Sequence, residues 1–138
     1  MATPGESELQ PGTVLDGKYR IEGQIGAGGM GAVYKAKHAK GTIVALKLLP
    51  PHYSSDEDYV ARFRREAAMA RKIDHPNVVR CLAAGEADGH HYMAMELVDG
   101  GDVQARVKEA PISEAEALSM AADVTKALEA AHKEGIIH

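Results

Sequence analysis

The fold is decided by the stretch Gly26-Ala27-Gly28-Gly29-Met30-Gly31, together with Val44-Ala45-Leu46-Lys47, which follows after one more predicted strand. The glycines have the spacing G-x-G-x-x-G. Because glycine has no Cβ, backbone N–H groups there can come close to a phosphate chain. The pattern is weak by itself, but alternating strands surround it and the second stretch ends in a lysine that could reach the same phosphates. Together the two stretches predict a phosphate-binding loop between strands.

Size and composition indicate one globular domain. The chain has 138 residues, of which 45% are apolar and 26% charged, and its formal net charge is −4. This charge argues against a general nucleic-acid-binding surface, which needs a basic excess. The single cysteine, Cys81, cannot form an internal disulfide. We expect it to serve as a small apolar residue on a buried strand. No signal peptide or membrane-spanning run is visible, so we expect a cytoplasmic protein.

The first two-thirds of the chain predict an antiparallel meander with one helix. Residues 1–12 are polar and rich in proline and glycine, which indicates a flexible tail. Strands are expected near residues 19–25, 33–37, 43–46, 78–85 and 91–97, the last two joined by a turn at 87–89. Between the third and fourth strands, Ser54 and Glu57 have capping-box spacing and predict a helix that runs to about Ile73.

Beyond Asp99-Gly100-Gly101 the pattern becomes helical. Asp102 is expected to cap a short helix to about Lys108, and Ser113 with Glu116 supplies a capping box for a longer one that Gly135 closes. The apolar face of the longer helix comprises Leu118, Ala121, Ala122, Thr125, Leu128 and Ala131.

The order of these elements resembles a eukaryotic-type serine/threonine protein kinase, and most of all the bacterial members of that family. The resemblance covers roughly residues 13–138. It implies an α+β fold: a kinase small lobe with hinge over 13–98, made of a five-stranded antiparallel sheet and one regulatory helix, and the first helices of the large lobe over 99–138. It also implies the ATP-binding part of an enzyme that transfers the γ-phosphate of ATP to serine or threonine hydroxyls of proteins.

The resemblance implies a nucleotide site built from the loop, the lysine strand and the hinge. Gly26, Gly28 and Gly31 would cover the phosphates, and Lys47 would sit on them, oriented by Glu66 of the regulatory helix. The remaining implied contacts are Ile25 beside the loop, Val33 and Ala45 on the adenine, Met95 as gatekeeper, the backbone of Glu96 and Val98 on the adenine edge, and Asp102 on the ribose.

Each polar member of this set has a simpler interpretation. Lys47 is otherwise a strand lysine whose amine reaches solvent, and Glu66 is otherwise a solvated helix carboxylate. For Asp102, helix capping competes with ribose binding, and both can hold.

Three of the seven histidines bear on a functional site. His90 and His91 are neighbours on a strand and point to opposite faces, without a Cys or His partner at ligand spacing, so we expect a hairpin surface and no metal site. His138 resembles the first residue of the catalytic-loop motif H-R-D. The catalytic aspartate and the magnesium ligands would follow it. We therefore expect Mg²⁺ binding only in a full-length form and no activity from this chain alone.

Other functions stay open. The chain could be a stand-alone small lobe that binds nucleotide or a partner without catalysis. A dinucleotide-binding module does not fit, because a strand follows the glycines and the residue 21 positions after Gly26 is Lys47, where an acidic residue is needed. The expected partners are ATP and, in a full-length form, a protein substrate, with neither nucleic acid nor membrane in this segment. Exposure of the apolar face of the last helix would favour self-association.

Overall fold

The computed structural model describes residues 8–28 and 31–137. The strands in these ranges are β1 (Val14–Leu15), β2 (Tyr19–Gly28), β3 (Gly31–His38), β4 (Ile43–Leu48), β5 (Cys81–Ala87) and β6 (His90–Glu96). The helices are the short 3-10 helix η1 (Pro51–Tyr53), α1 (Glu57–Ala70), α2 (Val103–Glu109) and α3 (Glu114–Lys133). They form two compact units, one from the residues before Lys72 together with Arg80–Leu97, the other from Lys72–Val79 and the residues from Val98 onward.

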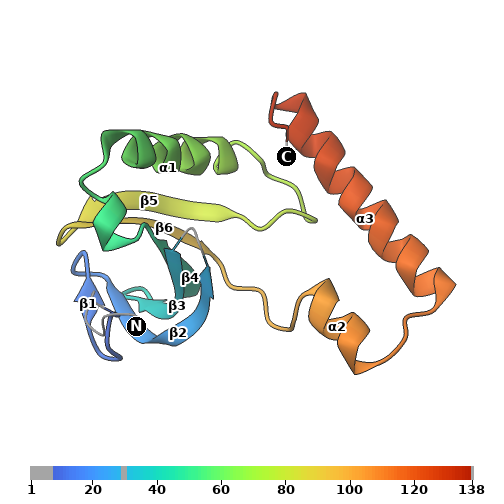
Figure 1. Ribbon diagram of the computed structural model, residues 1–138, viewed down its shortest axis with the longest axis horizontal. Coiled ribbons are helices and arrows are strands. Elements are labelled where there is room, and N and C mark those ends of the chain that lie inside the picture. Colours follow the sequence, from blue (N-terminus) through green and yellow to red (C-terminus); the bar gives the residue numbers. More distant parts are fainter. Residues whose placement is uncertain (1–7, 29–30, 138) are drawn as a thin grey trace. The chain divides into compact units, whose positions relative to one another are not determined.

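The first unit contains a six-stranded antiparallel sheet in the order β1-β2-β3-β4-β6-β5, with α1 beside β5 and β6 (Figure 1). The predicted antiparallel α+β fold is confirmed, but the sheet has six strands where five were expected. The additional strand is β1, which consists of only two residues, and its pairs are Val14 with Arg20 and Leu15 with Tyr19. A strand of two residues is too short to show the alternation of apolar and polar residues from which strands are predicted. It is recognised only by its pairing with the neighbouring strand.

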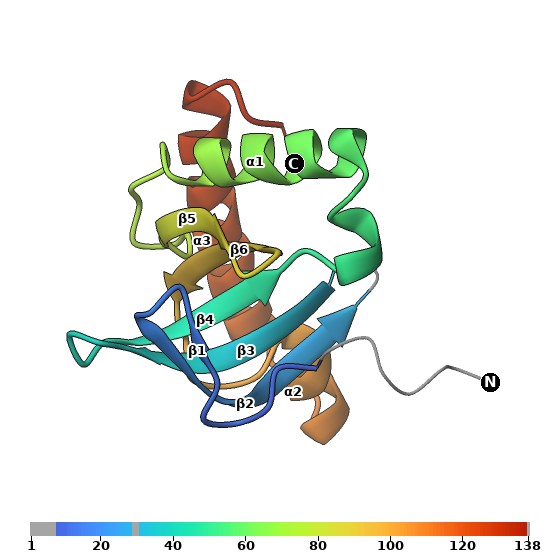
Figure 2. The same ribbon diagram turned by 90° about the vertical axis from the view of Figure 1, so that its left-hand side faces the viewer.

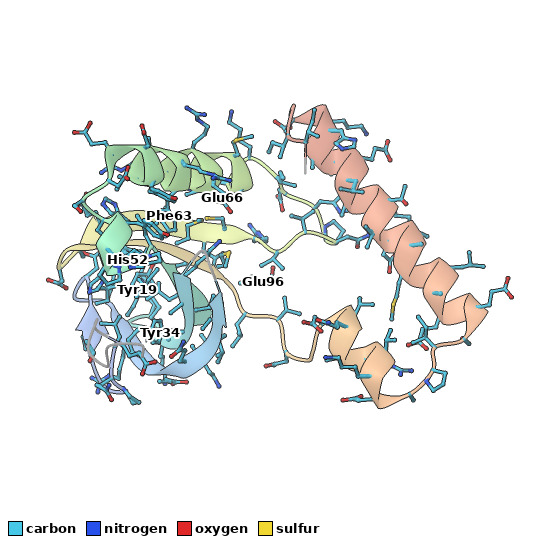
Figure 3. The ribbon with its side chains drawn as sticks, viewed as in Figure 1. Tyr19, Tyr34, His52, Phe63, Glu66 and Glu96 are labelled. Atoms are coloured by element: carbon cyan, nitrogen blue, oxygen red, sulfur yellow. The ribbon has the colours of Figure 1, made fainter. Side chains whose placement is uncertain are left out.

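The sheet is curled (Figure 2), and an apolar core lies on each side of it. Because successive residues of a strand point to opposite faces, the buried side chains of Leu46 and Leu48 face the core that contains Tyr19 and Tyr34 (Figure 3). Lys47 therefore lies on the other face, which α1 covers. The core on that face contains the buried Leu49, Phe63, Ala67 and Met93, with the partly buried Cys81 packed against it.

Helix α1 begins later than predicted, and Ser54 does not cap it. Its N-cap is Asp56, whose carboxylate accepts hydrogen bonds from the backbone N–H groups of Asp58 at 3.0 Å and Tyr59 at 3.4 Å. Ser54 instead ends η1, where its N–H donates to the carbonyl of Pro51. The prediction was wrong because Ser54 serves as the C-cap of η1, which leaves Asp56, two residues later, to cap α1. The helix also ends at Ala70, short of the expected Ile73.

The later strands are shifted along the chain relative to the prediction. β5 begins at Cys81 where 78 was expected, and β6 begins at His90. The expected turn between them is present, with positive φ at Asp88 (53°) and Gly89 (77°), as a two-residue hairpin requires. This turn sets the register of the hairpin.

The segment before β1 lies against the sheet over the residues that the structure describes. The Leu9 N–H donates to the Tyr34 hydroxyl at 3.1 Å, and the side chain of Leu9 packs on the core that contains Tyr19 and Tyr34. The Gly12 N–H donates to the carbonyl of Ile21 at 2.8 Å. These contacts attach residues 8–12, which the sequence assigned to a flexible tail, to the sheet.

The second unit confirms both predicted helix starts. Asp102 caps α2 through a hydrogen bond from the Ala105 N–H at 2.7 Å, and Ser113 caps α3 through one from the Glu116 N–H at 3.1 Å. At the other end of α3, Gly135 has a φ of 74°. The N–H groups of Gly135 and Ile136 donate to the carbonyls of His132 and Ala131, each at 3.0 Å, and close the helix in a Schellman motif. Segment 72–79 joins this unit, since the Asn77 side chain donates to the carbonyl of Asp123 at 3.0 Å.

Candidate functional site

β4 and α1 bring Lys47 and Glu66 together. The Lys47 Nζ lies 3.6 Å from Oε1 of Glu66, and Figure 3 shows Glu66 on the sheet side of α1. The side chain of Lys47 is 21% exposed and that of Glu66 is 48% exposed. An ammonium group that is largely removed from water needs a carboxylate partner. The sequence predicted this pairing, and the structure contains it.

The strand register places most of the predicted nucleotide contacts of the first unit on one face of the sheet. Residues that are paired directly across antiparallel strands lie on the same face. One such row crosses four strands and contains Gly26, Val33, Lys47 and Met93. The next row pairs Ala45 with Met95. Ala45 is buried, whereas Val33 and Met95 are half-buried. The face therefore offers small and apolar side chains beside Lys47; a further lysine on this face, Lys35, is paired with Ala45 and lies 3.8 Å from the Glu22 carboxylate.

Two of the loop glycines have different structural requirements. Gly31 has a φ of +121°, and a Cβ there would lie 2.0 Å from the carbonyl oxygen of Leu48. At Gly26 a Cβ would meet only the Cβ of Val33, at an ordinary 3.8 Å. Hence the fold itself requires glycine at 31, whereas at 26 it accepts a side chain. Gly28 ends β2 opposite Gly31, and the intervening Gly29 and Met30 lie outside the described residues.

The remaining contacts that the family resemblance implied are divided between the two units. Ile25 in the first unit is 51% exposed, and Val98 in the second is 61% exposed. Glu96 hydrogen-bonds twice to the Arg80 backbone: its N–H donates to the carbonyl at 2.9 Å, and its carboxylate accepts from the N–H at 3.3 Å. Asp102 also belongs to the second unit. Its capping role is established by its hydrogen bond, and its ribose role stays a prediction.

The sequence analysis missed a second ion-pair cluster on α1. The Arg64 Nη2 lies 3.0 Å from Oε2 of Glu86, and Oε1 of Glu86 lies 3.8 Å from Nε2 of His91. His91 is only 5% exposed, so the predicted hairpin-surface position is wrong for this histidine. The reason is that His91 lies on the same side of β6 as Met93, which α1 covers. The two-residue turn pairs Glu86 with His91 in register, and this signal was available in the sequence.

Over the ranges 8–28 and 31–137, no cluster of three or more His, Cys, Asp or Glu side chains could hold a metal ion. None of the helices described in those ranges combines the length and apolar character needed to cross a membrane. His138, the predicted catalytic-loop histidine, lies outside the described residues.

Comparison with known proteins assigns the family. The family model of the protein kinase domain matches residues 19–138. The serine/threonine-protein kinase PknJ of Mycobacterium tuberculosis is 43% identical over 132 residues, which cover 95% of this chain and 22% of PknJ. The serine/threonine-protein kinase pkn3 of Myxococcus xanthus is 41% identical over 141 residues, which cover 100% of this chain and 26% of pkn3.

A solved structure agrees with these matches. The crystal structure of the Mycobacterium tuberculosis PknI kinase domain has a TM-score of 0.81 at 32% identity, over 95% of this chain and 53% of that one. The chain belongs to the protein kinase family, and its curated relatives named here are bacterial serine/threonine kinases. It spans 22% of the length of PknJ and 26% of that of pkn3. The family and the kinase-like α+β fold predicted from the sequence are confirmed.

Proposed function

We propose that this chain is the ATP-binding part of a serine/threonine protein kinase, which in its full-length form transfers the γ-phosphate of ATP to protein hydroxyls. The observation that carries the proposal is the ion pair between Lys47 and Glu66, on the sheet face that also carries Val33 and Ala45. The family match supports the use of ATP and Mg²⁺ in general terms.

The side chains of this face suit a nucleotide. Ala45 and Val33 are small enough to leave space for a flat adenine ring, and Met95 would border that space. Lys47, oriented by Glu66, would pair with the α- and β-phosphates. One pair of unit charges about 4 Å apart interacts by about 4 kcal/mol at an effective dielectric constant of 20, before desolvation. The result is a cation fixed beside an apolar slot, an arrangement that binds a nucleotide before any chemistry occurs.

The loop and the hinge would complete the site. Backbone N–H groups at Gly26, Gly28 and Gly31 would approach the phosphates, because no side chain stands in the way. Beside the loop, Ile25 presents exposed apolar surface for the base. The other contacts in this proposal are the backbone of Glu96 and Val98 at the adenine edge and the carboxylate of Asp102 at the ribose.

We further propose that residues 13–98 are the small lobe with its hinge and that 99–138 begin the large lobe. In the family pattern, the catalytic aspartate and the magnesium ligands come after the position of His138. A polypeptide of these 138 residues is therefore expected to bind nucleotide without transferring phosphate at a useful rate.

The second unit supports a proposal of self-association. Leu118, Val124 and Leu128 of α3 are 63%, 56% and 37% exposed. An apolar groove of about 590 Å³ lies between α3 and segment 72–79. Exposed apolar surface of this kind favours association between copies. Sedimentation of the chain at increasing concentration tests this, with Leu118→Gln expected to shift the population toward monomer.

Nucleotide binding is tested by titrating the 138-residue chain with ATP and measuring the heat of binding by calorimetry. K47A and E66Q remove the two members of the ion pair, and K37A removes an exposed lysine of the neighbouring strand as the matched control. Loss of a charge-assisted contact is worth about 1.5–3 kcal/mol, so K47A should weaken binding roughly tenfold or more. Equal affinities of K47A and the unsubstituted chain would refute the proposal.

A further inference from the structure

Helix α1 carries charged residues on both flanks of its buried ridge. Phe63 and Ala67 form the ridge that packs on the sheet. At about 100° per residue, Arg64 lies about 80° to one side of the ridge and Glu66 about 80° to the other. A rotation of the helix about its axis therefore moves these two side chains in opposite senses relative to the sheet.

Both flanking residues are bound to strands of the sheet. On one side Glu66 pairs with Lys47 of β4 at 3.6 Å. On the other side Arg64 pairs with Glu86 of β5 at 3.0 Å. Glu86 lies in turn beside the buried His91, its register partner on β6, so the acceptor for Arg64 is held by the hairpin. The helix is thus fixed to the sheet at two points on opposite sides of its contact ridge.

The Arg64 flank is not held by close packing. A pocket of about 310 Å³ lies there between α1 and the hairpin, with Phe63, Ala67 and Tyr92 among its lining residues. Because side chains do not fill this space, apolar contact alone leaves the helix room to turn toward it. The ion pair between Arg64 and Glu86 spans the same flank and supplies the missing restraint.

We propose that Arg64 and Glu86 are positioning residues: their ion pair sets the rotation of α1 and so keeps Glu66 opposite Lys47. This inference rests on the proposed role of Lys47 in nucleotide binding, which it deepens. Neither residue belongs to the glycine loop, the lysine strand or the hinge, and neither is expected to touch the nucleotide.

The test measures the acylation rate of the Lys47 amine by an amine-reactive ester, with mass spectrometry of the resulting peptide. It uses the 138-residue chain without nucleotide, so a failure of ATP binding does not affect it. E66Q removes the partner of Lys47 and gives the reference increase, because an amine without a carboxylate partner is freer to react. R64Q and E86Q should raise the rate in the same direction, roughly twofold to fivefold, the change that a surface ion pair can produce.

Three comparisons separate positioning from a merely structural effect. The double variant R64Q/E86Q should react no faster than either single one, since both remove the same contact. R64K keeps a cation on this flank and should return the rate toward that of the unsubstituted chain. R65Q removes an equal charge from an exposed position of α1 and should change nothing.

The proposal is overturned if R64Q and E86Q leave the Lys47 rate at the level of R65Q while E66Q raises it. It is also overturned if E66Q has no effect, because the pair at Lys47 would then not persist in solution. Should R64Q fail to fold, E86Q and R64K carry the test. If these rates respond as expected but K47A binds ATP normally, the positioning of Lys47 stands and the proposed nucleotide role fails.

Discussion

Alanine at Gly31 should destabilise the fold, whereas alanine at Gly26 should not. The added Cβ at 31 would lie 2.0 Å from the Leu48 carbonyl oxygen and 3.1 Å from Cδ of Pro50, at a backbone φ of +121°. Since real Cβ contacts do not fall below 3.0 Å, β3 and the end of β4 must separate by about 1 Å. The strained φ costs about 1–3 kcal/mol, and the forced displacement about as much again.

We therefore expect G31A to lower the free energy of unfolding by roughly 2–6 kcal/mol. This is a large part of the roughly 5–15 kcal/mol that stabilises a typical domain. G26A is the matched control, because its Cβ meets only Val33 at 3.8 Å, and a change within about 0.5 kcal/mol is expected.

The assay is urea unfolding of the 138-residue variants followed by far-UV circular dichroism. A G31A chain with the stability of G26A would refute the steric argument. The pair also matters for the nucleotide site. If G26A weakens ATP binding at unchanged stability, the added Cβ hinders the approach of the phosphates to the backbone. Weaker ATP binding by G31A would instead include the effect of a distorted strand.

Three further predictions concern single side chains. The Tyr92 hydroxyl donates to the Asp16 carboxylate; burial and this bond raise the pKa of Tyr92, and the bond, aided by Lys18, lowers the pKa of Asp16. The stabilisation from the raised pKa of Tyr92 is lost as the pH rises above the ordinary value of 10.0, and the stabilisation from the lowered pKa of Asp16 is lost as the pH falls below 3.8. The stability advantage of the unsubstituted chain over Y92F should therefore be largest between these pH values. A pH-independent difference in urea unfolding would contradict this. Phe63 is 5% exposed, and F63A should cost about 3–5 kcal/mol in the same assay; a loss below about 1 kcal/mol would mean that α1 is not packed as described. D102A removes the cap of α2 and should cost about 1 kcal/mol, whereas D102N keeps a capping side chain. Weaker ATP binding by D102N at unchanged stability would therefore indicate that the Asp102 carboxylate contacts the ribose, and equal binding would exclude a contact that depends on its charge.

The two capping predictions in the second unit succeeded because capping is local. Asp102 and Ser113 bond to N–H groups three residues ahead, and a side chain of that length reaches only its own first turn. At α1 the capping-box spacing of Ser54 and Glu57 pointed to Ser54, but the cap is Asp56, two residues later, because η1, which begins at Pro51, ends at Ser54 and was not foreseen.

At the candidate site, too, local features were predicted and contacts between distant residues were missed. The glycine spacing and the lysine strand indicated the family, and Glu66 was chosen as the partner of Lys47 through the family pattern. The cluster of Arg64 with Glu86 escaped notice, because its members stand 22 residues apart and meet only when α1 lies beside the hairpin. His91 was assigned to the surface for the same reason, since alternation within a strand does not reveal which face another element will cover.

By itself the sequence determined the features that depend on neighbours within a few residues: the glycine loop, the alternation of the strands, the hairpin turn and the caps of α2 and α3. These follow from backbone geometry and short side-chain hydrogen bonds. Only the tertiary structure decided the pairing of β1, the burial of His91, the need for glycine at 31 beside Leu48, and the second attachment of α1. The strand β1 is too short to show alternation, so only its pairing with β2 defines it. The other three features depend on contacts between residues distant in the chain, which exist only after the sheet has curled and the helix has packed on it.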